Sequence, residues 1–487
     1  MNPPIIPGFF PDPSICRVGE RYYLVNSSFE YFPGIPLHTS TDLVTWEQVG
    51  NVLPTVGTLT VPAGLAGASS GIYAPTIRFH GGRFWVTTTS IGDVRRGHLI
   101  THATAPAGPW SEPVFTTGAF GIDPDLFWDD DGTCYLTWHD VLSPGISQAQ
   151  VNPETGELLT QPKHIWSGTG GHSPEGPHIY YRNGWYYLLV AEGGTGPGHM
   201  VTVARSRNVY GPFTANPANP ILTHRSTSSP VQATGHGDLV ELADGSWAMV
   251  HLGTQPRGSF PRWHTNGRET FIVGIDWVGD WPVVDEQRFE IPVVERSFTD
   301  RFDTSNLHPR WTSPASNPSS FTQMEADGLL LIAGRDAEGW ESANLLATRV
   351  TDRQWQAEVS ATGDLALTLR IDDAHQAQVQ RVGNTIKARA IVGPLSQDLG
   401  SESLGDAPVD LAIRAVSTGA SPGQRTGPDS VELGYVNSEN DFLSLAAIDG
   451  RYLSTELAGG FTGRMLGLEA LGENAKIHRF TYRPLQD

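Results

Sequence analysis

Three acidic residues and a histidine, far apart along the chain, sit at the start of copies of one short sequence unit. Asp12, Asp123 and His236 each open a copy, and Glu175 directly precedes Gly176, which opens another. Carboxyl groups gathered in one fold can divide acid and base work: a protonated one gives its proton to a leaving oxygen, and an ionised one activates water. Cleavage of a glycosidic bond requires such a pair on opposite sides of the bond.

The third carboxylate has a use in the same chemistry. A negative charge beside the acid raises its pKa and keeps it protonated near neutral pH. Each of the three taken alone is explained as well by a turn or strand-start residue that caps a backbone amide. Their shared position in the repeated unit favours one common site.

The elements that would position these residues form a repeat. Each unit reads as two short strands joined by a hairpin that contains glycine. The five openers are Asp12, Ala74, Asp123, Gly176 and His236, spaced 62, 49, 53 and 60 residues apart. A repeat of roughly 50 residues built from short strands is typical of propeller blades. We therefore predict a five-bladed β-propeller whose openers point into one central funnel.

Other residues fall near the same funnel. Tyr73 stands just before its unit, as Glu175 does, and Phe29 closes the first hairpin near Asp12. Arg268 has no local partner in the sequence, so it either lies on the surface or reaches into the funnel.

The run Asp129–Gly132 lacks the spacing of a calcium loop and reads as a hairpin turn. The glycine-rich stretch 193–198 lacks the Lys-Ser/Thr pair of a phosphate loop and reads as a rim loop.

Length and composition limit the classes of partner. The chain has 487 residues, and a formal net charge of −20 argues against nucleic acid or an anionic membrane. No apolar run is long enough to span a bilayer, and the N-terminal residues do not read as a secretory signal, so a cytoplasmic location is expected. Cys16 and Cys134 fall in non-adjacent blades and are predicted to be buried free thiols.

The pattern changes near residue 286. Downstream, alternating strands follow one another without the blade unit, which is typical of a β-sandwich. The prediction is an all-β chain of two domains: a catalytic five-bladed β-propeller over residues 1–285, a linker over 286–300, and a concanavalin- or laminin-G-like β-sandwich over 301–487.

Six short strings, in this order, resemble those of glycoside hydrolase family 43. They are Pro11–Ser14, Gly121–Pro124, Pro174–His178, Glu192–Thr195, Gly235–Glu241 and Gly267–Thr270. They are most similar to the β-xylosidase and α-L-arabinofuranosidase group with an appended C-terminal β-sandwich. The likeness is strong to about residue 285 and looser beyond it.

The resemblance implies an inverting, exo-acting hydrolase that releases a terminal pentose from arabinoxylan-type oligosaccharides. Asp12 would be the general base, Glu175 the general acid, and Asp123 the residue that tunes the acid and orients substrate. The implied sugar-binding residues are Phe29, Tyr73, His236, Arg268 and Phe461, the last on a sandwich loop that closes the pocket. No cofactor is implied as required, although in some relatives the histidine adjoins a structural calcium ion.

One departure bears on specificity. Some β-xylosidases of this group carry Trp at the position of Tyr73 and Asp at the position of Thr76, so the resemblance leans toward arabinofuranosidase, with strict β-1,4-xylosidase as the alternative. A transferase, a non-catalytic sugar-binding propeller and an interaction platform are the remaining hypotheses. The expected partner is a small oligosaccharide, and a homo-oligomer is possible.

Overall fold

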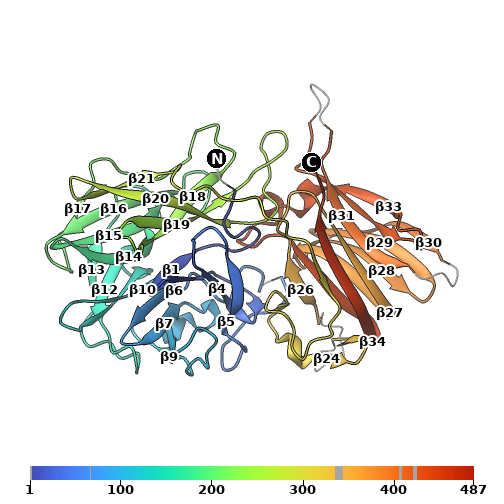
Figure 1. Cartoon of the computed structure of the whole chain (residues 1–487), viewed down its shortest axis with the longest axis horizontal. Coiled ribbons are helices and arrows are strands. Elements are labelled where there is room, and N and C mark those ends of the chain that lie inside the picture. The colour runs from blue at the N-terminus through green and yellow to red at the C-terminus, as the bar shows by residue number, and fades with distance from the viewer. Residues whose placement is uncertain (1–2, 66, 335–343, 405–408, 420–424, 487) are drawn as a thin grey trace.

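The computed structural model describes residues 3–65, 67–334, 344–404, 409–419 and 425–486, and nearly all regular structure in them is β. Two β-rich bodies lie beside each other: an N-terminal one, blue to yellow-green in Figure 1, and a C-terminal one, yellow to red. None of the helices in the described ranges is both long and apolar enough to cross a membrane.

The N-terminal body consists of five four-stranded antiparallel sheets, which confirms the predicted propeller. Blade one is β1 (Ser14–Val18), β2 (Arg21–Val25), β4 (Gly34–Ser40) and β5 (Glu47–Leu53); blade two is β6 (Thr76–His80), β7 (Arg83–Thr88), β8 (Leu99–Ala103) and β9 (Val114–Phe115), with a 3-10 helix at Ile91–Arg96. Blade three is β10 (Gly121–Trp128), β11 (Cys134–Asp140), β12 (Gly145–Gln150) and β13 (Lys163–Trp166).

The last two blades complete the ring. Blade four is β14 (Glu175–Arg182), β15 (Trp185–Glu192), β16 (Met200–Ser206) and β17 (Thr214–Ala215); blade five is β18 (Gln232–Glu241), β19 (Trp247–Thr254), β20 (Glu269–Val278) and β21 (Trp281–Asp285). The N-terminal segment closes the ring, because Ile6 bridges Thr270 at the start of β20. Cys16 and Cys134 are buried free thiols, as predicted.

Four of the five openers share an unusual backbone conformation. Asp12, Asp123, Gly176 and His236 have φ values of 52°, 56°, 55° and 51°. In blades three to five the register between the first two strands shifts at this place, as at a β-bulge. Non-glycine residues rarely adopt positive φ, and bulges re-aim side chains at functional sites. In blades one, three and five the opener's side chain is therefore turned toward the axis at the cost of local strain.

Two residues after each opener, the side chains form a buried polar column that the sequence analysis did not predict. These positions are Ser14, Thr76, Asp125, His178 and Asp238. Arg78 joins them: its Nη2 lies 2.7 Å from Asp125 and its Nη1 lies 2.9 Å from Asp238. The Ser14 hydroxyl donates to Asp238 at 2.6 Å. The column ties the inner strands together directly beneath the openers.

The C-terminal body is a β-sandwich, as predicted. Its strands are β22 (Phe298–Asp300), β24 (Thr322–Glu325), β25 (Gly328–Ile332), β26 (Leu346–Arg349), β27 (Trp355–Asp372), β28 (His375–Val382), β29 (Thr385–Val392), β30 (Leu395–Ser403), β31 (Asp410–Val416), β32 (Ser430–Val436), β33 (Phe442–Asp449) and β34 (Met465–Pro484). Short helices occupy Pro318–Ser320, Gly450–Leu453 and, as α1, Thr455–Ala458. No strand or helix is assigned to residues 286–297.

Strand β27 contributes to the contact between the propeller and the sandwich. Leu365, Leu367 and Leu369 alternate into the sandwich core, as the period of two requires. On the opposite face Arg370 is also buried and donates to the Tyr31 hydroxyl at 2.9 Å, across the domain boundary. In addition, β3 (Tyr31–Phe32) of the propeller pairs with β23 (Ser313–Pro314). Both faces of the second half of β27 are thus covered.

Candidate active site

A cavity of about 220 Å³ opens at the propeller axis, above the polar column. All eight side chains that the sequence analysis assigned to the site line it: Asp12, Phe29, Tyr73, Asp123, Glu175, His236, Arg268 and Phe461. Its remaining lining residues are Ala74, Ile122, Ser173, Gly194, Thr195 and His199. Thr76, which the sequence analysis compared with an aspartate of relatives, does not line this cavity and is buried in β6.

Asp12 is held as a carboxylate. Arg268 Nη1 lies 2.7 Å from its Oδ1, and the Ser27 hydroxyl donates to its Oδ2 at 2.6 Å. Burial by itself would raise the pKa of this carboxyl, but the Arg268 charge, the nearby His236 ring and the Ser27 hydrogen bond together lower it below the ordinary value. Asp12 is therefore ionised at neutral pH. Arg268 reaches the funnel rather than the surface.

Glu175 has the opposite environment. Burial raises its pKa to about 7, and the negative charge of Asp12 contributes while Arg268 partly offsets it. Asp123 accepts a hydrogen bond from the backbone N–H of Gly176 at 3.1 Å. Burial, followed by the charges of Glu175 and Asp12, raises the pKa of Asp123 well above its ordinary value. Two neighbouring carboxyl groups cannot both ionise cheaply, so the pair keeps a proton near neutral pH.

Two histidines complete the polar side of the cavity. His236 Nδ1 is 3.8 Å from Asp12 Oδ1, too far for a hydrogen bond, and burial lowers its pKa to about 4. His199 is 1% exposed, bonds the Ala233 carbonyl through Nδ1, and has no partner for Nε2 among the described residues. Both rings are neutral at pH 7, so they offer hydrogen bonds rather than charge to a ligand.

Aromatic side chains from both domains form the opposite wall. The Phe29 and Phe461 rings stack with centroids 5.7 Å apart, and the Tyr73 ring lies 5.2 Å from Phe29. Phe461 comes from the sandwich segment between α1 and β34, and its backbone N–H donates to Ser69 at 2.8 Å. The sandwich therefore supplies part of the cavity wall, and the predicted placement of Phe461 there agrees with the geometry.

The described residues around His236 include no cluster of acidic calcium ligands. Calcium takes six to eight oxygen ligands. Asp12, 3.8 Å from His236, is engaged by Arg268, and Asp125 and Asp238 are engaged by Arg78. Across the described ranges, no group of three or more His, Cys, Asp or Glu side chains is arranged to hold a metal. No calcium site built from acidic side chains is therefore seen among the described residues.

The Asp129–Gly132 run forms a turn, in which the Gly132 N–H donates to the Asp129 carbonyl at 2.9 Å.

Three polar lining residues were missed from the sequence. Ser173, Thr195 and His199 lie on the connections before and after the first two strands of blade four. Thr195 accepts a hydrogen bond from Arg268 Nη1 at 3.1 Å. A signal was available, because the 193–198 loop follows the second strand of its blade, as Phe29 does in blade one. The rim loop is thus part of the site.

Comparison with known proteins agrees with this geometry. Residues 1–282 match the model of glycosyl hydrolases family 43, and residues 299–483 match that of the β-xylosidase C-terminal concanavalin A-like domain. A non-reducing end α-L-arabinofuranosidase of Bacteroides ovatus, BoGH43B, is 33% identical over 96% of this chain and 91% of its own length.

Two further relatives extend the match. A xylosidase/arabinosidase 43B of Humicola insolens is 38% identical over 73% of this chain and 70% of its own. The solved structure of the Bacteroides ovatus xyloglucan PUL GH43B superposes with a TM-score of 0.88 at 32% identity, covering all of both chains. With its propeller, sandwich and acidic cavity, the chain belongs to family 43 of the glycosyl hydrolases and is a glycosidase.

Proposed function

We propose that the chain is an exo-acting, inverting hydrolase that removes a terminal α-L-arabinofuranosyl residue from arabinoxylan-type oligosaccharides, with β-D-xylosidase activity as the close alternative. The observation that carries the proposal is the pairing of an ionised Asp12 with a protonated Glu175 in one small cavity. These residues come from blades one and four, so they face a bound sugar from different sides.

The proposed roles follow from the environments. Asp12, kept ionised by Arg268 and Ser27, takes a proton from the attacking water. Glu175 gives its proton to the leaving oxygen. Asp123 lies beside the acid, and as a second carboxyl it opposes loss of the proton that the pair holds. The resemblance gives Asp123 the role of tuning the acid and orienting substrate, and its own raised pKa supports sharing of that proton.

The size and walls of the cavity support exo action on a small sugar. A cavity of about 220 Å³ lies below the usual range of about 300–1,000 Å³ for ligand sites, so it suits one ring rather than a polymer segment. Phe29, Tyr73 and Phe461 give an apolar wall against which one sugar face can pack. The proposal of a pentose as the released sugar rests on the named relatives, of which one is an arabinofuranosidase and the other a xylosidase/arabinosidase.

The testing experiment follows the released sugar by proton NMR. Arabinoxylan oligosaccharides and xylobiose are treated with the enzyme, and the anomeric signals are recorded in the first minutes, before mutarotation. We expect arabinose to be released first, with inverted anomeric configuration. Retained configuration would contradict the general-base role of Asp12. Faster release of xylose from xylobiose would favour the xylosidase alternative.

A further inference from the structure

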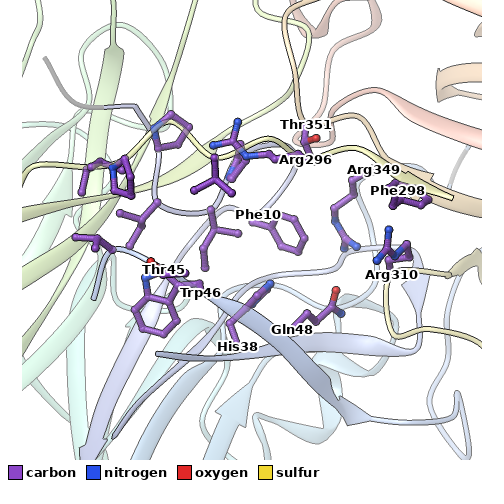
Figure 2. Close-up of a pocket in the computed structure, with 18 of the residues that line it drawn as sticks. Phe10, His38, Thr45, Trp46, Gln48, Arg296, Phe298, Arg310, Arg349 and Thr351 are labelled. Carbon is purple, nitrogen blue, oxygen red and sulfur yellow. The ribbon is translucent and has the colours of Figure 1, made fainter. Parts of the chain in front are cut away.

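A second cavity, of about 280 Å³, lies between the two domains and shares no lining residue with the catalytic one. From the propeller it takes residues 4–7, Phe10 and side chains of β4, β5 and the turn between them. From the linker and the second domain it takes residues between 291 and 310 and residues at the end of β26. Figure 2 shows Phe10 at its centre, with His38 and Gln48 below and Arg349 and Arg310 to one side.

Arg349 is the first unusual feature of this cavity. It is 6% exposed, and its Nε donates to the Phe9 carbonyl at 2.7 Å. Its guanidinium carbon lies 4.4 Å from the centroid of the Phe10 ring. No ion pair joins Arg349 to a carboxylate anywhere in the described part of the chain. Burial lowers its pKa to about 10. A buried cation normally has a counter-charge, so this guanidinium favours an anion in the cavity.

Two further side chains also favour an anion in the cavity. Arg310 lies with its guanidinium carbon 3.8 Å from the Phe298 ring centroid, and its hydrogen bonds go to His308 instead of a carboxylate. His38 is 4% exposed, and its Nδ1 has no hydrogen-bond partner among the described residues. Of the three arginines that line the cavity, only Arg296 forms an ion pair there, with Asp352 at 3.4 Å. The lining thus holds three arginines and no carboxylate, in a chain of net charge −20.

The rest of the lining is apolar and aromatic. Phe10, Trp46 and Phe298 contribute rings, and Ile5, Ile6 and Ile291 contribute aliphatic surface. The volume is nearly twice that of the ~150 Å³ apolar cavity that accepts benzene, so it has room for a ring and a short acidic arm. A guanidinium fork matches a carboxylate with two parallel hydrogen bonds.

From this combination we infer that the interdomain cavity is a binding site for a small aryl carboxylate, with its carboxylate at Arg349 and Arg310 and its ring against Phe10. A neutral arene would leave both guanidinium groups unpaired. Inorganic phosphate would pair with them but would leave the aromatic lining unused. The ligand would contact both domains at once, since Phe10 belongs to the propeller and Arg349 to the sandwich.

Isothermal titration calorimetry on the whole protein with 3-phenylpropanoate tests the inference. We expect one saturable site per chain, and a dissociation constant at least about tenfold higher for the neutral 3-phenylpropan-1-ol, because a charge-assisted bond is lost. Saturating L-arabinose and xylose should leave the affinity unchanged. Equal binding of the alcohol, displacement by the sugars, or binding of inorganic phosphate as tight as that of the acid would each overturn the proposal.

Variants test the position of the site. Arg310→Gln removes one guanidinium, and Gln48→Glu places a carboxylate opposite it; each should weaken binding about tenfold or more. Arg389→Gln removes an arginine on β29, far from the cavity lining, and serves as the charge-matched control. Circular dichroism and the melting temperature confirm folding. Unchanged affinity in folded Arg310→Gln and Gln48→Glu proteins would place the ligand elsewhere.

Discussion

Arg268 and Asp12 form an ion pair across 256 positions of sequence, with Nη1 2.7 Å from Oδ1 and Nη2 3.3 Å from Oδ2. Arg268 stands immediately before β20 of blade five, and Asp12 opens blade one. A contact between the last and the first blade therefore also favours the ionised form of the proposed base. Because the pair is buried, its electrostatic effect on Asp12 is screened little by salt.

Replacing Arg268 by Gln should shift the acidic limb of the pH profile. Loss of the guanidinium raises the pKa of Asp12, so the fall of kcat/KM on acidification should begin at a higher pH than in the wild type. We expect a loss of about 100-fold in kcat/KM at the optimum, since an orienting ion pair is lost as well. Ser27→Ala removes a single hydrogen bond and should shift the limb less, in the same direction. An unmoved limb in both variants would mean that another group controls it.

Replacing Glu175 should separate substrates by leaving group. Glu175→Ala should lower hydrolysis of natural oligosaccharides by about 10²–10⁴-fold, because the leaving oxygen loses its proton donor. The leaving oxygen of an aryl glycoside with a good leaving group needs no protonation, so the variant's hydrolysis of such substrates should fall much less. Asp12→Ala should depress both substrates alike, since both need an activated water. Equal losses on the two substrates in both variants would show that the roles are wrongly assigned.

The alkaline limb should report the Glu175 and Asp123 pair. With the pKa of Glu175 at about 7, kcat/KM should fall as the pH rises through neutrality. Asp123→Asn removes one of the two carboxyl groups, which lowers the pKa of the remaining acid and moves this limb to lower pH. The measurement is kcat/KM against pH for the wild type and Asp123→Asn on one substrate. A shift to higher pH would contradict the coupling.

The sequence predicted the propeller and the converging site because both rest on a repeat. Every unit begins with the same strand–hairpin pattern, so the openers share one phase. Asp12 and Asp123 are openers and Glu175 directly precedes one, so a five-membered ring was predicted to bring the three carboxylates together. The polar column beneath them obeys the same phase, two residues further on, and could have been found by extending that count. Its members are of four different residue types, which obscures their shared phase in the sequence.

Other features of the structure cannot be predicted from the repeat in the sequence. The pairing of Arg268 with Asp12 and the placement of Phe461 depend on how the ring closes and how the sandwich docks, through side chains such as Arg370. Phe461 was assigned through family resemblance, and the interdomain cavity was not predicted at all. The residues that line that cavity come from several segments far apart in the sequence, so no local sequence pattern predicts it.

Removing Phe461 should weaken substrate binding without unfolding the protein. Phe461→Ala takes one ring from the apolar wall but leaves Asp12 and Glu175 in place, so KM should rise several-fold with a smaller change in kcat. Tyr452→Ala, an exposed aromatic residue of the same domain, is the matched control. A drop in kcat alone, with KM unchanged, would indicate that Phe461 acts on the chemical step instead.

Arg78 should contribute strongly to stability. Arg78→Met would leave Asp125 and Asp238 buried at the axis without their counter-charge, and breaking a buried ion pair in this way costs about 3–5 kcal/mol. Arg288→Gln breaks pairs with Asp276 and Asp285 at the surface and should cost less than about 1 kcal/mol. Urea unfolding followed by tryptophan fluorescence measures both. If the two variants lost equal stability, the axial column would be no more than another solvated ion pair. A larger loss in Arg78→Met alone would identify the column as the element that holds the five inner strands, and with them the catalytic carboxyl groups, in register.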